Sequence, residues 1–472
     1  MYKISLFFLI LLSSPMTFAE ILSEVGDQTA LSLTIYNHDL ALIRDRRKVD
    51  LPAGEQELAI RGVSGRLQPE TALLESRDDS GAFRVLEQNF NYDLLTPRKL
   101  LEKYLGRQIG ILRTNPATGV ETRETATVLS TQEGLVVRIG DRIETDPGGR
   151  FLFDDIPANL RDQPTLVTRL AVAQAGAHSL ELSYLSGGLS WKADYVARLD
   201  EKDSRMDLAG WVTLENRSGT TYADARLQLV AGDVNRVSAP PQNRRFKAMM
   251  AAGLADEGVR EEALFEYHLY SLPRPTTLLD RQTKQVALLS TSAVPVHKEY
   301  LLQGQQYYYQ DRHGEIGRKL PVGVWLKFRN DEATRLGLPL PAGIVRVYKS
   351  GRQGNLQFIG EDRIDHTPRN EEVRLKLGNA FDVTARRVQT DFRKQNFGHP
   401  YKFAAQSSFR ITLRNAKEEP VEVLVREPMP GDWQVLSESE PHEKPDARTA
   451  QWKLQVPAQG ETVLEYSVLV RY

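Results

Sequence analysis

The chain of 472 residues has no cysteine, almost no net charge and a single long apolar run. Without cysteine it cannot form disulfides, thiolate zinc sites, iron–sulfur clusters, cysteine nucleophiles or thioester lipid anchors. The 61 basic and 62 acidic side chains nearly cancel, which argues against a nucleic-acid partner. The chain is 41% hydrophobic and 26% charged, which is the composition of a globular protein. Its length corresponds to about two to four domains.

The apolar run lies at the N-terminus. Lys3 precedes an apolar stretch over residues 4–12, and Thr17 and Ala19 place small residues before Glu20. This pattern predicts a secretory signal peptide over residues 1–19, cleaved after Ala19. A membrane span needs about 18 consecutive apolar residues, and no later apolar run is that long. No transmembrane segment is therefore expected after cleavage. The sequence therefore predicts an exported protein, periplasmic in a bacterium.

Apolar and polar residues alternate along many short segments. Alternation places one face of a strand on a core and the other in water, which is typical of antiparallel sheets. The segments include residues 31–36, 180–184, 373–377, 409–413, 421–425 and 452–456. We therefore expect a mainly β chain, built from several antiparallel β-sandwich or small-barrel domains.

Three turns and one helix punctuate this pattern. Residues 51–55, 340–344 and 456–461 each combine proline with glycine before an alternating run, which is consistent with several sandwich modules and leaves internal duplication open. A short helix is expected near 97–105, because Thr96 can cap it, Pro97 suits its first position and Gly106 ends it.

These signals divide the chain into four parts. After the signal peptide we expect an N-terminal β domain at 20–95, then the short helix with a small β-barrel-like domain at 96–164. The third part is a β-sandwich region at 165–472, interrupted by a flexible insertion at about 237–263. Alternation stops in this insertion, which is rich in proline and basic residues. We interpret it as a linker or loop, with contact to an anionic glycan or lipid as the alternative.

Several stretches carry a family resemblance. They are Tyr184–Tyr195, Gly210–Gly219, Tyr222–Asp233, Phe265–Leu272 with Lys284–Leu289, Leu340–Tyr348 and Phe358–Asp362. In this order they resemble the bacterial domain-of-unknown-function family 4139, in particular its exported, mucoidy inhibitor A-like members. The resemblance implies a β-sandwich architecture and an envelope location. It implies no reaction, and it carries no catalytic or binding residue onto this chain.

The residues themselves show no catalytic or metal-binding motif. The eight histidines form no H-E-x-x-H or H-x-H motif; they are His38, His178, His268, His297, His313, His366, His399 and His442. Asp362 and His366 would share a strand face, but a hydrogen-bonded or solvent-facing pair is favoured over a metal pair, because a metal site needs three ligands. Within each acidic doublet, at 154–155 and at 371–372, the two side chains would point to opposite faces of a strand. We predict no catalytic, cofactor-binding or metal residue.

Aromatic residues suggest packing more than ligand binding. Trp191 and Tyr195 are expected in the core. The run Tyr307–Tyr309 is expected to pack in a sheet, with a glycan- or protein-binding surface as the alternative. Asn216–Gly219 predicts a hairpin turn. The last strand, residues 464–472, is expected to close a sandwich, although its terminal aromatic residue also resembles an outer-membrane barrel signal.

The sequence thus predicts an exported, non-catalytic, β-rich protein that binds an envelope protein or a surface polysaccharide. Two alternatives stay open. One is an envelope glycan or peptide hydrolase with dispersed acidic and histidine residues, and the other is a structural part of an outer-membrane assembly. No cofactor and no nucleic-acid partner are expected, and the sequence leaves the oligomeric state open.

Overall fold

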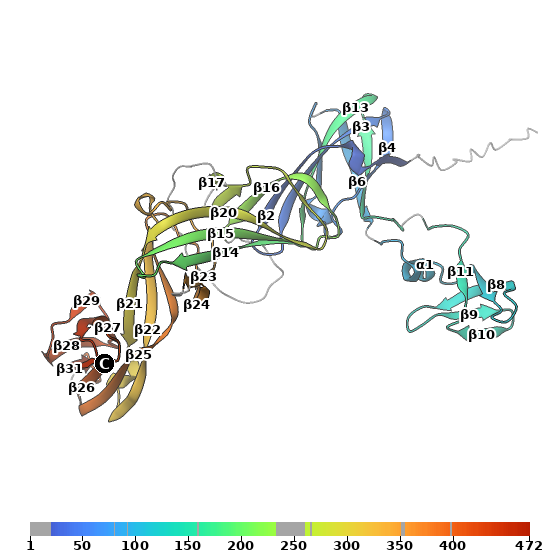
Figure 1. Ribbon diagram of the computed structural model, residues 1–472. Helices are drawn as coiled ribbons and strands as arrows, with labels where there is room; N and C mark the ends of the chain where they lie inside the picture. The colour runs from blue at the N-terminus through green and yellow to red at the C-terminus, as the bar shows by residue number, and fades with distance from the viewer. Residues whose placement is uncertain are drawn as a thin grey trace, which may run out of the picture. The chain divides into compact units, whose positions relative to one another are not determined.

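A computed structural model describes residues 20–79, 81–91, 93–157, 160–232, 260–264, 267–350, 355–396 and 399–472 (Figure 1). The elements are almost all β-strands, as the alternation predicted. They form two compact units, described in turn below. The first contains the chain up to Trp191 with Leu214–Val230 and Leu272–Lys284. The second contains Lys192–Thr213, Ala231–Ser271 and Gln285–Tyr472.

Two sheets of the first unit combine strands that lie far apart in the sequence. One has the order β1 (Glu20–Ser23), β4 (Gly54–Arg61), β12 (Thr165–Val172), β6 (Phe83–Asn91). The other contains β16 (Tyr222–Ala231), β2 (Gln28–Tyr36), β3 (Ala41–Leu51), β13 (Gly176–Ser186) and β5 (Leu73–Ser76), with β19 (Thr276–Leu278) beside β16. The predicted division at 164/165 stays a prediction, and hydrogen-bonded strands link residues on both sides of it.

A smaller sheet packs with the only α-helix of the described residues (Figure 1). Its order is β10 (Arg142–Thr145), β9 (Val136–Ile139), β8 (Glu121–Ser130), β7 (Gln108–Thr114), β11 (Arg150–Leu152). The sheet is open rather than closed into the small barrel expected, because β10 and β11 do not pair. Helix α1 (Pro97–Lys103) confirms the predicted helix, and the Thr96 hydroxyl accepts a hydrogen bond from the Lys99 amide at 3.2 Å.

The second unit holds a mixed sheet and most of the family resemblance. The sheet has the order β20 (Gln282–Pro295), β15 (Arg205–Asn216), β14 (Leu189–Leu199), β23 (Gly343–Ser350), β24 (Leu356–Ile364). A further pair is formed by β17 (Arg260–Leu264) and β18 (Tyr267–Ser271). Most of the predicted insertion at 237–263 lies outside the described residues.

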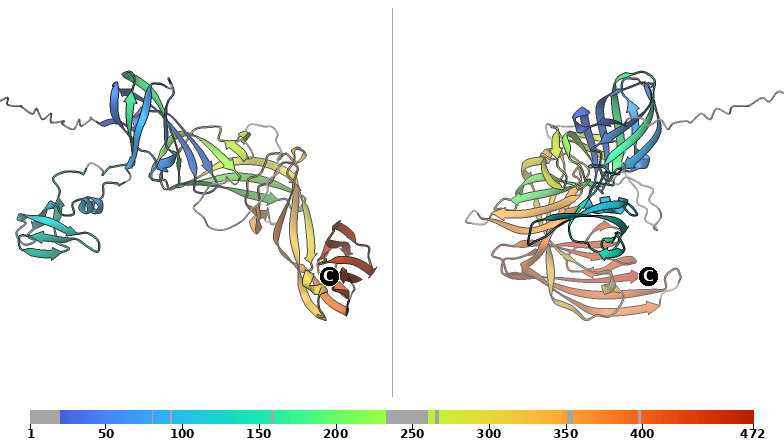
Figure 2. Two further views of the ribbon diagram at one scale, coloured as in Figure 1. Left: turned by 180° about the vertical axis from the view of Figure 1, so that it is seen from behind. Right: turned by 90° about the vertical axis from the view of Figure 1, so that its right-hand side faces the viewer.

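The C-terminal sheet of this unit curls around a large apolar core (Figure 2). Its order is β28 (Asp432–Glu438), β31 (Gly460–Arg471), β26 (Phe403–Asn415), β25 (Glu372–Asn396), β22 (Glu315–Arg329), β21 (His297–Gln303), β27 (Val421–Pro428), β30 (Thr449–Val456), β29 (Glu443–Asp446). The core includes Phe409, Trp452 and Tyr466. The last strand, β31, lies between β28 and β26, so its alternating apolar face covers this core.

The expectation that the run Tyr307–Tyr309 lies in a sheet is wrong, because residues 306–309 form a 3-10 turn. This turn follows β21 and presses Tyr309 into the core. There the Tyr309 hydroxyl lies 2.8 Å from the Glu427 carboxylate and 2.9 Å from the Tyr466 hydroxyl. Glu427 forms a buried ion pair with Arg387, whose guanidinium lies 4.8 Å from the Tyr308 ring centre. Tyr308 and Tyr309 therefore pack, as expected, although in a turn.

Short 3-10 turns also occur at Val25–Asp27, Pro69–Thr71 and Glu332–Thr334.

Candidate functional site

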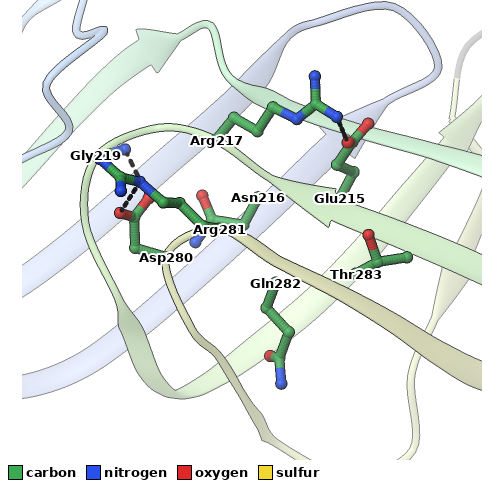
Figure 3. Close-up of a pocket in the computed structure, with 8 residues that line it drawn as sticks. All are labelled: Glu215, Asn216, Arg217, Gly219, Asp280, Arg281, Gln282 and Thr283. Carbon is green, nitrogen blue, oxygen red and sulfur yellow. Dashed lines mark hydrogen bonds and ion pairs between the residues drawn. The ribbon is translucent and has the colours of Figure 1, made fainter.

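A polar pocket of about 460 Å³ lies where the last residues of β15 face the turn that precedes β20 (Figure 3). These residues fall in the segments Leu214–Val230 and Leu272–Lys284, which belong to the first unit, although most of both strands belongs to the second. Two short segments form its lining. Glu215 and Asn216 end β15, and Arg217 and Gly219 follow it. Asp280 and Arg281 lie in the facing turn, and Gln282 and Thr283 begin β20. Both segments belong to stretches that carry the family resemblance or adjoin it.

Asn216 holds the two segments together. It is fully buried, and its side-chain amide donates to the carbonyl oxygens of Leu278 at 3.2 Å and Leu279 at 3.0 Å. The same amide donates to the Thr220 carbonyl at 2.9 Å, while its oxygen accepts from the Ser218 amide at 3.0 Å. Because buried carbonyls are costly without partners, this one side chain fixes the course of both pocket walls.

A buried network of hydroxyl groups lies behind the β15 wall. The Ser64 and Ser186 hydroxyls are 2.6 Å apart, and Ser64 also donates to the Ser218 carbonyl at 3.2 Å. The Tyr222 hydroxyl donates to the Ser218 hydroxyl at 3.0 Å, and the Tyr184 hydroxyl accepts from the Ser64 amide at 3.1 Å. Burial raises the pKa of Tyr222 to about 12, so its hydroxyl stays protonated as a neutral donor. These hydrogen bonds connect Ser218, which lies between the lining residues Arg217 and Gly219, to Ser64 and Tyr222.

Gly188 explains the glycine pair in the resemblance. Its φ is +82°, and a Cβ atom there would lie 2.6 Å from the Ser218 Cα and 2.7 Å from the Arg217 carbonyl oxygen. Its amide donates to the Asp39 carboxylate at 2.6 Å. The β13–β14 turn can therefore approach the pocket segment this closely only with glycine at this position.

Charged groups of both signs line the rim of the pocket. Arg217 pairs with Glu215, and the Arg281 guanidinium lies 3.6 Å from the Asp280 carboxylate. In Figure 3 the Arg217 side chain runs toward Glu215, whereas that of Arg281 turns back toward Asp280. Asp280 also accepts from the Gly219 amide at 3.0 Å. The pocket thus offers exposed guanidinium donors without excess charge, which suits a polar ligand rich in acceptor oxygens.

Residues singled out in the sequence are used in packing. Trp191 and Tyr195 are buried, as expected. The Trp191 indole donates to the Val230 carbonyl at 3.2 Å, and the Tyr195 hydroxyl donates to the Pro341 carbonyl at 2.8 Å. Both polar atoms are therefore engaged within their own unit.

Asp362 and His366 do not converge on a shared ligand. The Asp362 carboxylate accepts from the Lys376 amide at 2.7 Å, and the His366 Nδ1 accepts from the Ala342 amide at 3.2 Å. In the acidic doublet at 154–155, Asp155 is engaged within the protein. Hydrogen bonds from Tyr104 and then Arg107 lower the pKa of its carboxyl group. Among the described residues, no group of three histidine, aspartate or glutamate side chains is placed to hold a metal ion.

Two further asparagines repeat the arrangement of Asn216. Asn330, after β22, donates to the carbonyls of Leu338 at 2.8 Å and Pro368 at 2.9 Å. Asn415, at the end of β26, donates to those of Glu419 at 2.8 Å and Pro457 at 3.0 Å. Asn330 and Asn415 were not predicted from the sequence. Their signal is an alternating strand that ends in asparagine, as in residues 212–216, 326–330 and 411–415.

A family model, Domain of unknown function (DUF4139), matches residues 180–472, which is more than half of the chain. No curated protein matches the sequence. Within the part of the chain that the structure describes, no helix combines the length and the apolar character needed to cross a membrane.

Proposed function

The chain belongs to the DUF4139 family of domains of unknown function, and we propose that it is an exported, non-catalytic binding protein of the bacterial cell envelope. The observation that carries this proposal is the pocket around Asn216. Its two walls are joined by the hydrogen bonds of buried Asn216, and its rim presents the exposed guanidinium groups of Arg217 and Arg281 to solvent. A pocket with buried hydrogen-bonded walls and an exposed polar rim suits recognition of a polar ligand.

Export rests on the sequence pattern of residues 1–19. The first described strand, β1, begins at Glu20, so cleavage after Ala19 would leave every described strand in the mature chain. The Glu20 carboxylate pairs with the Arg161 guanidinium at 2.8 and 2.5 Å, which anchors the start of β1. The proposed location is the periplasm.

The proposed ligand is a surface polymer, with an envelope protein as the other outcome of the test. Arginine is enriched at recognition sites because its planar guanidinium donates several hydrogen bonds in fixed directions. Arg217 and Arg281 are 71% and 89% exposed, so a ligand reaches both without displacing the core. Their carboxylate partners, Glu215 and Asp280, balance their charge.

The experiment compares envelope binding by the mature chain and by the double variant Arg217→Ala/Arg281→Ala. The measurements are cosedimentation with purified cell-surface polysaccharide and crosslinking in envelope extracts. We expect the double variant to bind at least about tenfold more weakly, the loss typical of removing recognition side chains. Arg226→Ala, an exposed arginine on β16 outside the pocket, is the matched control. Equal binding by all three proteins, or no binding by the mature chain, would contradict the proposal.

A hydrolase is the second candidate, and one observation favours it. The His442 Nδ1 lies 2.9 Å from the Glu438 carboxylate, an arrangement that can orient an imidazole for proton transfer. The test is release of soluble fragments from envelope glycan and peptide by the mature chain and by His442→Gln. Release that the substitution abolishes would establish the hydrolase and displace the binding proposal.

A further inference from the structure

A second polar groove lies in the other unit, on the outer face of the C-terminal sheet. It has a volume of about 360 Å³ and crosses strands β25, β26, β31 and β28. Half of its ten lining residues are serine or threonine: Thr390, Ser408, Ser437, Ser439 and Ser467. The others are Phe409, Arg410, Glu438, Glu465 and Tyr466. None of these residues takes part in the pocket around Asn216.

Two β-bulges flank the groove. The pairing of β25 with β26 shifts between Gln389 and Asp391, which leaves Thr390 as the extra residue. The pairing of β28 with β31 shifts between Val435 and Ser437. Both shifts adjoin the same register pair of β26 and β31, Ser408 with Ser467. Bulges re-aim side chains and are enriched beside binding sites, so two of them on one transverse row form a built feature of the sheet.

Small side chains make the floor of the groove. The Ser408 hydroxyl donates to the Ser467 hydroxyl at 3.1 Å, and no long side chain rises from this row between the bulges. Longer side chains stand on the next outward row, where the Arg410 guanidinium pairs with the Glu465 carboxylate at 2.6 Å. The groove is therefore deepest at Ser408 and Ser467, because the next outward-facing residues on the same strands, Arg410 and Glu465, have longer side chains.

The charged groups around the groove are already paired within the protein. Arg410 and Glu465 neutralise each other. The Glu438 carboxylate accepts from the Trp452 indole at 3.1 Å and lies 2.9 Å from His442. What the groove offers a ligand is thus mainly hydroxyl groups. The Ser408 hydroxyl already donates to Ser467 and the Ser439 hydroxyl already accepts from the Glu465 amide, so a ligand meets the remaining donors and acceptors of the row.

We propose that this groove binds a neutral saccharide unit of an envelope glycan. A sugar presents hydroxyl groups that both donate and accept, which matches the serine and threonine lining, and it brings no charge that would have to break the Arg410–Glu465 pair. The volume lies within the range of about 300–1,000 Å³ that is usual for small-molecule sites. The inference stands apart from the proposed function, because it uses other residues in the other unit.

The test measures binding of maltotriose, cellotriose and chitotriose to the mature chain by calorimetry and saturation-transfer NMR. Tri-galacturonate and a neutral alanine tripeptide amide are the comparison probes. We expect at least one of the three neutral sugars to bind with a dissociation constant of about 1 mM or tighter. The tripeptide and the charged sugar should bind at least about tenfold more weakly.

The variant Ser408→Val/Ser467→Val removes the floor hydroxyls and keeps residues suited to strands. We expect it to lose at least about tenfold in sugar affinity with an unchanged melting temperature. Thr412→Val, on the same strand beyond Arg410, is the matched control, and Ser437→Val at the groove edge is the substitute if the double variant melts early. Arg217→Ala/Arg281→Ala should bind the sugar normally, which separates this proposal from the first.

Three results would overturn the proposal. They are the absence of binding by all three neutral sugars, a preference for the peptide or the charged sugar, and full affinity in the serine variants.

Discussion

The side-chain amide of Asn415 donates to the main-chain carbonyl oxygen of Pro457 at 3.0 Å. The same relationship joins Asn216 to Leu279 and Asn330 to Pro368. In each case a residue with positive φ follows two positions later, at Gln459, Arg281 or Asn370, and the next strand then begins. One local device, a buried asparagine that clips a turn, thus recurs three times in the described chain.

This recurrence bears on internal duplication, which the sequence left open. The three proline–glycine turns at 51–55, 340–344 and 456–461 suggested it, yet only the last of them belongs to the recurring device. The shared features are instead a strand that ends in asparagine and a turn with a left-handed residue. The repeated arrangement is therefore shown by the hydrogen bonds of the three asparagines and not by the proline and glycine content of the turns.

Asn415→Ala should lower the free energy of unfolding by about 2–4 kcal/mol. The substitution removes the part-buried hydrogen bonds to the carbonyls of Glu419 and Pro457 and the one from the Lys417 amide, and each lost bond costs about 1 kcal/mol. Urea unfolding followed by tryptophan fluorescence measures the change. Asn396→Ala, at the exposed end of β25, is the control and should cost less than about 0.5 kcal/mol. Equal effects of the two substitutions would contradict the role of the clip.

Gly188→Ala should destabilise the chain far more than Gly54→Ala. Both glycines have positive φ, +82° and +96°, so alanine pays the backbone strain of about 1 kcal/mol at either site. Only at Gly188 would the new Cβ meet backbone atoms at 2.6–2.7 Å, whereas at Gly54 it meets nothing within 4 Å. Thermal melting of the two variants measures the difference. Similar melting temperatures would show that the β13–β14 turn can move away from Ser218.

Asp203→Asn should remove a pH-dependent part of the stability. Burial alone would raise the pKa of Asp203, but the ammonium groups of Lys298 and Lys349 outweigh it and lower the pKa below the ordinary 3.8. A carboxyl with a lowered folded-state pKa stabilises the fold above its unfolded pKa, and this contribution is lost as the pH falls through the folded value. Asparagine also tolerates the positive φ of this position.

We therefore expect the free energy of unfolding of the wild type to exceed that of Asp203→Asn by about 1 kcal/mol at neutral pH. The difference should begin to shrink near pH 3.8 and vanish only below the lowered folded-state pKa. Urea midpoints across the acid range measure this difference. Glu201→Gln, an exposed acid in the same turn, should show no such trend. A difference that grows toward acid pH would reverse the sign of the argument.

A fragment limited to the family match, residues 180–472, should fail to fold its first strands. In the full chain β13 pairs with β3 along its whole length and also with β5, and β16 pairs in parallel with β2. Removing the earlier residues takes away Leu33, Ile35 and Ile43 from the core. We expect aggregation and strong binding of a hydrophobic dye, whereas the chain from Glu20 to Tyr472 should be monodisperse and bind little dye. A soluble fragment with cooperative unfolding would contradict this dependence.

Features set by neighbours in the sequence could be predicted. The helix at 97–103 followed from Thr96, Pro97 and Gly106, because capping and backbone preferences act within a few residues. The β character followed from alternation, which reports one buried face. The tyrosine run at 307–309 shows the limit: β propensity favoured a strand, but the chain has to turn between β21 and β22, and the core takes up Tyr309 instead.

The candidate site could not be predicted in the same way. The turn at Asn216–Gly219 was expected, but its partner segment at 280–283 lies some sixty residues later along the chain. Alternation does not say which strand pairs with which, so the contact of Asn216 with Leu279 had no local signal beyond an asparagine at a strand end. The sequence by itself determined the β class, the helix and the expectation of export, because each depends on short-range patterns. Only the tertiary structure decided the strand partners, the buried asparagine clips and the two polar hollows, because these depend on which apolar faces pack together across the chain.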